Sequence, residues 1–259
     1  MAEWPLQGRV ALVTGAGSPE GIGFAAARLL AARGAAVAVT STTDRIQQRA
    51  QELGSAGVDA AGFVADLTSF EQATALAAAA GQRFGRIDIL VNNAGIAQLG
   101  ESSQLRPFAE MDEAQWDRDI AVNLKTAFAI TRAVLPGMLE RGYGRIVNVS
   151  SVTGPVVSYP GNAGYSAAKS GMDGLTRALA IETGRQGVTV NSVAPGWIAT
   201  GSSDEAELEG GRNTPVGRPG TPDEVAELIA FLATDGARYI TGRSIVVDGG
   251  NTIQEHKGA

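Results

Sequence analysis

Short apolar runs alternate along the chain with longer segments in which apolar residues recur at helical spacing. The short runs are typical of buried strands, and the longer periodic segments are typical of helices. The pattern predicts strands at residues 9–13, 36–40, 60–65, 87–91, 145–149, 188–193 and 244–247. It predicts helices at residues 22–33, 44–53, 69–84, about 113–141, 163–183 and 222–234. Because strands and helices alternate, we expect an α/β fold in which helices cover both faces of a parallel sheet.

The composition is that of a globular protein with a substantial core. Of the 259 residues, 44% are hydrophobic, and no Pro- or Ser-rich linker interrupts the repeated pattern. We therefore expect a single domain over residues 1–259. The net charge of −6 would repel nucleic acid or an anionic membrane, so we expect neither as a partner.

The residues available for chemistry are also limited. The chain contains no cysteine, which excludes disulfides, thiol nucleophiles and thiolate metal sites. Its one histidine, His256, lies in the C-terminal tail, and because metal sites need several converging ligands we expect no metal. Residues 1–9 lack a signal-peptide pattern, and no apolar run approaches the roughly 18 residues of a membrane span. These features predict a soluble, cytoplasmic protein.

Tyr165 and Lys169 form the strongest candidate site. They are four residues apart on the predicted helix 163–183, so their side chains lie on one face. A nearby cation favours the phenolate and lowers the pKa of a phenol. A phenol tuned in this way can exchange a proton with an alcohol or ketone oxygen. The alternative is a helix surface that happens to carry both residues.

A glycine-rich turn at residues 14–23 follows the first predicted strand and opens the first helix. In a parallel α/β sheet this is where a dinucleotide binds, because glycine lets the backbone approach the pyrophosphate and the helix N-terminus supplies free N–H groups. Many such turns contain glycine without a ligand, and the spacing also fits an S-adenosylmethionine site.

Two further strand ends carry polar residues. Asp66 is placed to accept a hydrogen bond from an adenine amino group, although it could equally cap the following helix. The small residues at 92–95 would let a ribose and a nicotinamide pack closely, or they could form an ordinary Asn-Gly turn.

In chain order, these motifs resemble those of the classical short-chain dehydrogenase/reductase family, from about residue 8 to residue 250. The resemblance is carried by residues 14–23 and 92–95, Asn123, Ser151, Tyr165 with Lys169, Pro195, Gly196 and Thr200. It implies a Rossmann fold, in which helices cover both faces of a doubly wound, seven-stranded parallel sheet. It also implies a homotetramer or dimer.

The resemblance implies a role for each catalytic residue. Tyr165 would be the general acid in reduction and the general base in oxidation. Lys169 would lower the pKa of Tyr165 and bind the nicotinamide ribose. Ser151 would hydrogen-bond the substrate oxygen, and Asn123 would hold a water that relays protons from Lys169. Thr200 would bond the nicotinamide carboxamide.

The implied cofactor contacts lie at the ends of the first four strands, on the Tyr165 helix and after the sixth strand. They are Gly15, Gly17, Gly21, Ile22, Gly23, Ser41, Thr42, Arg45, Asp66, Leu67, Asn93, Ala94, Gly95, Tyr165, Lys169, Pro195, Gly196, Ile198 and Thr200.

The cofactor preference depends on the end of the second strand. An NAD enzyme usually places an acidic residue there, whose carboxylate repels a 2′-phosphate. This chain has Ser41 and Thr42, with Arg45 within reach, so we expect NADP(H) to be favoured over NAD(H). The main objection is Glu20, because many NADP-dependent relatives carry a basic residue at that point of the turn.

The chain departs from the family pattern in ways that bear on the reaction. Five residues separate Gly15 and Gly21, two more than usual. Enoyl-thioester reductases have a similarly long turn, but their Tyr-to-Lys spacing is longer than the one here, so we expect carbonyl rather than double-bond reduction. The stretch from Ser151 to Tyr165 is one residue longer than in close 3-oxoacyl reductases.

The substrate cleft should be walled by residues 96–110, 154–161 and 197–214, with a lid at about 197–218. The acidic run 204–209 is most simply a solvated helix face, but it would oppose docking of an acidic carrier protein. Arg141 and Arg185 could still form the basic patch that such a carrier needs.

The predicted function is transfer of a hydride between NADP(H) and a small ketone or secondary alcohol, as in a carbonyl reductase. One alternative is a 3-oxoacyl-thioester reductase that acts on an acyl carrier protein. A non-catalytic dinucleotide sensor is the alternative of another class, and the presence of Ser151, Tyr165 and Lys169 together argues against it.

Overall fold

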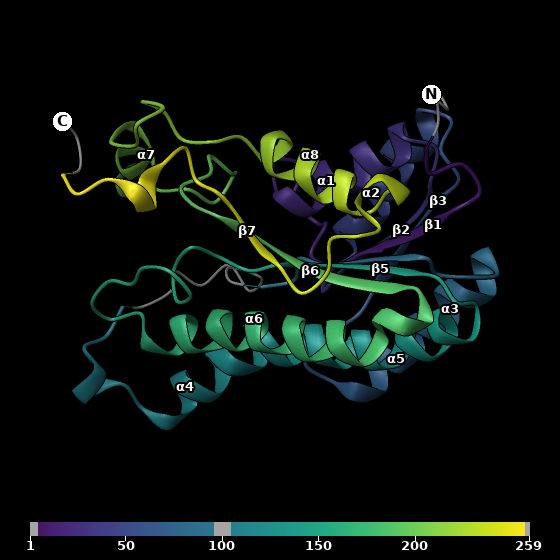
Figure 1. Cartoon of the computed structure of the whole chain (residues 1–259), viewed down its shortest axis with the longest axis horizontal. Helices are drawn as coiled ribbons and strands as arrows, with labels where there is room; N and C mark the ends of the chain where they lie inside the picture. Colours follow the sequence, from purple (N-terminus) through teal and green to yellow (C-terminus); the bar gives the residue numbers. More distant parts are fainter. Residues whose placement is uncertain (1–4, 96–104, 257–259) are drawn as a thin grey trace.

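The computed structural model describes residues 5–95 and 105–256. Seven strands form one parallel sheet in the order β3-β2-β1-β4-β5-β6-β7 (Figure 1). They are β1 Val10–Val13, β2 Ala36–Ser41, β3 Ala60–Val64, β4 Ile89–Asn92, β5 Gly144–Val149, β6 Val188–Pro195 and β7 Ser244–Val247. This arrangement confirms the predicted doubly wound, seven-stranded sheet. The strand order reverses between β1 and β4, which is where such sheets bind ligands.

Helices cover both faces of the sheet, as predicted. Helices α1, α2 and α8 pack on one face, and α3, α5 and α6 on the other (Figure 1). The α-helices are α1 Ile22–Ala32, α2 Arg45–Ser55, α3 Phe70–Phe84, α4 Glu113–Ile120, α5 Thr126–Glu140, α6 Ala163–Thr183, α7 Glu205–Arg212 and α8 Pro222–Leu232. Short helical turns are η1 Phe108–Glu110, η2 Ala121–Lys125, η3 Gly184–Gln186, η4 Asp235–Ala237 and η5 Asn251–Ile253.

Local sequence explains where several helices begin. The Ser69 side chain accepts a hydrogen bond from the Gln72 N–H, so this residue caps α3 rather than belonging to it. Asp66, the other candidate cap, instead accepts bonds from the N–H (2.9 Å) and hydroxyl (2.7 Å) of Thr68, so the predicted capping alternative is wrong. Thr221 caps α8 in a reciprocal capping box with Glu224.

One predicted helix differs from the structure. The helix expected at about 113–141 is divided into α4, the π-helical turn η2 and α5, and the Asn123 side chain in that turn donates to the carbonyl of Asp119 in α4. The segment at 201–218 contains α7, so its acidic run is indeed a helix. Neither the π-turn nor the limits of α7 follow from apolar spacing, because both depend on side-chain bonds to the local backbone.

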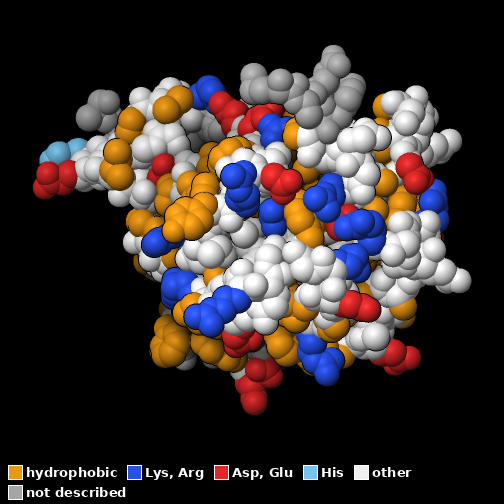
Figure 2. All heavy atoms as spheres, turned by 45° about the vertical axis from the view of Figure 1, so that its right-hand side comes forward, with side chains coloured by type: hydrophobic (Ala, Val, Ile, Leu, Met, Phe, Trp, Pro, Cys, Tyr) orange, Lys and Arg blue, Asp and Glu red, His pale blue; other side chains and the backbone are white. Residues whose placement is uncertain are grey.

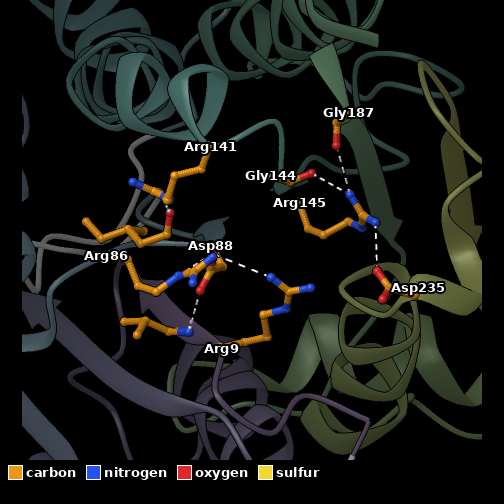
Figure 3. A network of polar contacts seen from close by, with 10 residues as sticks. Arg9, Arg86, Asp88, Arg141, Gly144, Arg145, Gly187 and Asp235 are labelled. Carbon is orange, nitrogen blue, oxygen red and sulfur yellow. Dashed lines mark hydrogen bonds and ion pairs between the residues drawn. The ribbon is translucent and has the colours of Figure 1, made fainter. Parts of the chain in front are cut away.

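A buried carboxylate organises the amino-terminal edge of the sheet (Figure 3). Asp88 is fully buried, and its oxygens accept bonds from the Val10 N–H (3.0 Å) and from Arg86 Nε (2.8 Å). Arg9 approaches the same carboxylate at 3.9 Å. Burial of a charge is unfavourable unless it is paired and hydrogen-bonded, and Asp88 meets both conditions.

Arginines gather around this network. Arg145 donates to Asp235 at 2.9 Å, and Arg141 donates to the Ile87 carbonyl at 2.6 Å (Figure 3). The Tyr143 ring lies against both the Arg9 and Arg145 guanidinium groups, whose Cζ atoms are 3.5 and 4.3 Å from its centroid. Figure 2, in which the right-hand side of Figure 1 comes forward, shows Lys and Arg side chains gathered on this face.

A groove of about 820 Å³ also lies at this edge, between the ends of α1 and α2 and the starts of β1 and β3. Its lining includes Phe24, Leu53 and Arg28 but none of the residues predicted for the active site. Among the described residues, no helix is long and apolar enough to cross a membrane.

Replacing Asp88 by Ala should destabilise the fold strongly. The substitution leaves the Val10 N–H and two arginines without their acceptor, which costs about 3 kcal/mol and lowers the Tm by about 10 °C. Asp59→Ala is the matched control, because its partner Arg83 and Asp59 itself are both about half exposed. Thermal unfolding followed by circular dichroism checks this prediction, and equal shifts for the two variants would contradict it.

Candidate active site

The predicted site residues gather at one edge of the sheet. Because all seven strands are parallel, the segments that follow them emerge on the same side. The residues after β1 through β6 therefore meet at the carboxyl-terminal edge, opposite the arginine network. In Figure 1 this edge lies toward α7.

The glycine turn is tied to the end of β4 at the point where the strand order reverses. The Thr14 hydroxyl accepts bonds from the N–H groups of Asn93 and Ala94, both at 3.0 Å. The Asn93 amide donates to the carbonyls of Thr14 (3.1 Å) and Gly15 (3.0 Å). A Cβ on Gly23 would lie 2.5 Å from the Asn93 amide nitrogen. These residues therefore hold the turn against β4, in addition to any contact with a ligand.

Gly15 has the backbone conformation that glycine adopts most easily. Its φ is +66°, and a Cβ there would lie 2.8 Å from the Ala94 Cα. Ala94 itself is buried in the core on the α3, α5 and α6 face of the sheet, whereas Ile22 is half-buried against the core on the other face. Of the predicted turn residues, Gly21 has the most room, since its nearest neighbour is Ser18 at 3.3 Å.

Tyr165 and Lys169 lie one turn apart on α6, as predicted. The Lys169 ammonium is 5.5 Å from the centre of the Tyr165 ring, and it donates to the Val149 carbonyl at 2.9 Å. Lys169 is only 4% exposed. Ser151, two residues after Val149, accepts a bond from the Thr153 N–H at 3.0 Å and interacts with the Tyr165 hydroxyl. The end of β5 thus places the serine beside the phenol and anchors the lysine.

Asn123 and Gly95 join this group from two other elements. A Cβ on Gly95 would lie 3.1 Å from Asn123 Oδ1 and 3.5 Å from Lys169 Nζ. A side chain at residue 95 would therefore crowd the amide, and glycine lets the end of β4 lie close to both groups. The structure brings together all four residues predicted to be catalytic: Asn123, Ser151, Tyr165 and Lys169.

Burial shifts the pKa values of the phenol and the ammonium toward their neutral forms. It raises the pKa of Tyr165 to about 12, an effect that the Ser151 hydroxyl partly offsets. It lowers the pKa of Lys169 to about 8, which the neighbouring Asp173 partly offsets. In the chain alone the pKa of Tyr165 therefore moves in the direction opposite to the one expected from the Lys169 charge.

A buried row of polar side chains below the site was not predicted from the sequence. Asn92 donates to Asn148 at 2.8 Å, Asn148 donates to Thr176 at 2.7 Å, and the hydroxyls of Thr176 and Ser192 are 2.8 Å apart. All four are at most 2% exposed. The row joins β4, β5 and β6 to α6, the helix that carries Tyr165 and Lys169. Its signal in the sequence is the presence of polar residues within these largely apolar strands, among them Asn92, Asn148 and Ser192.

The ends of β2 and β3 form the far part of the predicted cofactor site. Ser41 is buried and donates to the Thr43 carbonyl at 2.9 Å, and Thr42 is half-buried. A Cβ on Gly17 would lie 2.8 Å from Arg45 Nε, so the exposed arginine reaches across to the glycine turn. After β3, Asp66 is exposed, whereas the Leu67 side chain lies in the core and leaves only its backbone for contact.

The segment after β6 forms the part of the predicted site farthest along the sheet from β2 and β3. Gly196 packs against Asp248 beyond Pro195, and Ile198 pairs with Gly220. The Thr200 hydroxyl lies 3.0 and 3.2 Å from the hydroxyls of Ser202 and Ser203.

The predicted walls of the cleft are only partly described. Residues 96–104 of the first wall lie outside the described residues. Its remainder contacts the second wall, since a Cβ on Gly161 would lie 3.0 Å from the Leu105 Cβ. The third wall contains α7.

Comparisons with known proteins agree with this arrangement. A family model described as enoyl-(acyl carrier protein) reductase matches residues 15–252. The oxidoreductase UcpA of Salmonella typhimurium is 40% identical over 262 residues, covering 96% of this chain and 97% of that protein. The 3-oxoacyl-acyl-carrier-protein reductase FabG of Vibrio cholerae is 42% identical over 249 residues, covering 95% and 98%. A solved structure of a mutant short-chain dehydrogenase/reductase from Serratia marcescens matches with a TM-score of 0.87 and 35% identity, covering 96% and 99%.

The low pKa of Lys169 should make stability depend on pH. Unfolded lysine keeps a pKa near 10.5 while the folded pKa is about 8, so between these values the unfolded chain binds more protons and stability rises with pH. Lys169→Met should remove this contribution, which is at most about 3 kcal/mol. Urea unfolding of both proteins between these pH values measures the difference. The same pH slope in both would show that Lys169 titrates normally.

Proposed function

The chain belongs to the short-chain dehydrogenase/reductase family, and we propose that it is a carbonyl reductase that transfers a hydride between NADP(H) and a ketone or secondary alcohol. The observation that carries this proposal is the group formed by Tyr165, Ser151 and Lys169 at the carboxyl-terminal edge of the sheet. A side chain at residue 95 would crowd the Asn123 amide and the Lys169 ammonium, so glycine keeps the end of β4 close to both groups.

Each side chain has a step in the proposed reaction. In reduction the Tyr165 hydroxyl donates its proton to the carbonyl oxygen, and in oxidation the phenolate takes it back. The Ser151 hydroxyl bonds the same oxygen and stabilises the charge that develops there. Lys169 bonds the ribose and stabilises the phenolate, and Asn123 holds a water that returns protons from solvent. When bound, the nicotinamide dinucleotide supplies or accepts the hydride.

One feature of the sequence favours reduction of a carbonyl over reduction of a double bond. The four-residue spacing from Tyr165 to Lys169 favours a C=O group over the C=C group of an enoyl thioester. Burial raises the pKa of Tyr165 to about 12, so proton transfer from the phenol requires stabilisation of the phenolate, which is the part proposed for Lys169.

Charges around the glycine turn favour NADP(H). Arg45 is exposed, and its guanidinium has no ion pair within the described part of the chain. Glu20, which was the main objection, has its carboxylate against Gly201, 2.8 Å from where a Cβ would be. An arginine without a carboxylate partner beside Ser41 suits a 2′-phosphate.

A 3-oxoacyl thioester is the second candidate substrate, favoured by the similarity to FabG. Arg141 and Arg185 precede β5 and β6 and therefore lie at the amino-terminal edge, whereas the acidic helix α7 lies near Tyr165. Within one chain this arrangement opposes docking of an acidic carrier protein beside the site.

We also propose that residues 1–259 form one domain, which the single continuous sheet supports. We further propose that the chain forms a homotetramer, and light scattering tests this.

Tyr165→Phe should reduce NADPH-dependent turnover about 100-fold or more while leaving cofactor binding intact, because only the transferable proton is lost. The assay measures NADPH oxidation with small ketones, ketoesters and a 3-oxoacyl thioester. Tyr239→Phe is the matched control, because Tyr239 is fully exposed. Tight cofactor binding without turnover of any carbonyl would instead favour the sensor, and turnover of the thioester alone would favour the second candidate.

Arg45→Ala should lower kcat/KM for NADPH about 10- to 100-fold and change the value for NADH little, because one charge-assisted contact with the 2′-phosphate is lost. Arg28→Ala removes an equal charge at an exposed site paired with Asp223 and should change neither. A wild-type preference for NADH would overturn the cofactor assignment.

A further inference from the structure

Asp173 is a buried acidic residue to which the proposed reaction gives no part. It lies on the buried side of α6 and is 4% exposed. It forms no ion pair with any residue that the structure describes, and its Oδ1 has no hydrogen-bond partner among them. Burial of a carboxylate without a direct partner is unfavourable. The packing of α6 therefore does not explain an aspartate at this position.

The residue one helical turn before Asp173 is Lys169. Residues four apart on a helix are neighbours, with Cβ atoms about 5–6 Å apart. Both side chains are only 4% exposed, so their charges interact through the protein interior, where screening by water is weak. The Lys169 ammonium donates to the Val149 carbonyl at 2.9 Å and not to the carboxylate. Asp173 therefore acts on Lys169 by its charge and leaves the other two N–H donors of the ammonium available.

Charged groups on the neighbouring elements do not replace this carboxylate. On α4, Asp119 lies against Gly164 in the first turn of α6, and burial raises the pKa of Asp119. On η2, the Lys125 ammonium lies over the Phe70 ring, 5.4 Å from its centre. Strands β5 and β6, against which α6 packs, contain no acidic residue. The negative charge close to the buried ammonium is therefore supplied by α6 itself.

The shifts in pKa agree with this geometry. Burial lowers the pKa of Lys169 to about 8, and the charge of Asp173 acts in the opposite direction. Glu207 of α7 acts on Tyr165 instead. Asp173 is one turn from Lys169 but two turns from Tyr165, so its charge favours the ammonium more than it opposes the phenolate.

We propose that Asp173 is a positioning residue that keeps the Lys169 ammonium charged in the buried site, so that this charge can stabilise the phenolate of Tyr165. The proposal rests on the proposed function for the role of the ammonium in the reaction. The effect of Asp173 on Lys169 itself can be measured without cofactor or substrate, so the two proposals can fail separately.

The direct test follows the NMR signals of the lysine ε-carbons in the cofactor-free protein as the pH is changed. The chain has only three lysines, and the signal of Lys169 is identified by its loss in Lys169→Met. Asp173→Asn keeps the size of the side chain and removes its charge. The titration midpoint of Lys169 should then lie lower than in the wild type by about 1 on the pH scale.

Glu182→Gln is the matched control, because Glu182 is an exposed acidic residue on the same helix and its replacement should leave the midpoint unchanged. Asp173→Glu keeps the charge and should titrate as the wild type does. If Asp173→Asn does not fold, Asp173→Ser removes the same charge and takes its place. A midpoint that removal of the charge leaves unchanged, or that Asp173→Glu lowers equally, would overturn the proposal.

The second measurement is the pH profile of NADPH-dependent ketone reduction. The rate should fall as the pH rises through the pKa of Lys169, and in Asp173→Asn this fall should begin at lower pH. We expect a loss of about 10-fold at pH 8 and little change at pH 6. A loss by the same factor at every pH would overturn the proposal, because it would show a role in packing alone. Absence of turnover in the wild type would contradict the proposed function, and the NMR titration would still decide the role of Asp173.

Discussion

The active site depends on the buried row of hydrogen bonds from Asn92 through Asn148 and Thr176 to Ser192. Apolar contacts alone would let α6 slide along the sheet, because they are non-directional. Amide and hydroxyl groups in a dry interior must find partners at defined distances, since an unpaired one costs about 1–3 kcal/mol. The row therefore fixes α6 against β4, β5 and β6. Lys169 also donates a hydrogen bond to the carbonyl of Val149, the last residue of β5.

This rigid placement has an electrostatic consequence for the two reactive groups. Holding Tyr165 and Lys169 in the interior removes them from water, which favours the neutral form of each. The Ser151 hydroxyl and the Asp173 carboxylate act in the opposite direction, but burial is the larger effect on both groups. The protein alone thus stores a protonated phenol beside an ammonium that loses its proton easily. Proton transfer from this phenol therefore requires that the phenolate be stabilised, which is the part proposed for the Lys169 charge.

The sequence predicted these elements well where apolar spacing decides the structure. The limits of α6 and β7 agree to the residue, and most other strands and helices agree within two. The prediction of one continuous helix at about 113–141 was wrong, because a local side-chain bond competes with the apolar spacing in the π-turn at Asn123. The buried row could not be predicted, because which of Asn92, Asn148 and Ser192 face one another depends on strand register. The tie of Asn93 to the glycine turn likewise depends on the meeting of β1 and β4, which lie far apart in the chain.

The distribution of charge around the glycine turn favours an anionic ligand there. The N-terminus of α1 has no acidic residue in its first turn, so its positive end remains available to a phosphate, and Arg45 adds a full charge nearby. Glu20 is the one acidic side chain of the glycine turn, and it faces Gly201. An anionic dinucleotide would therefore meet positive charge at this turn from both the helix N-terminus and Arg45.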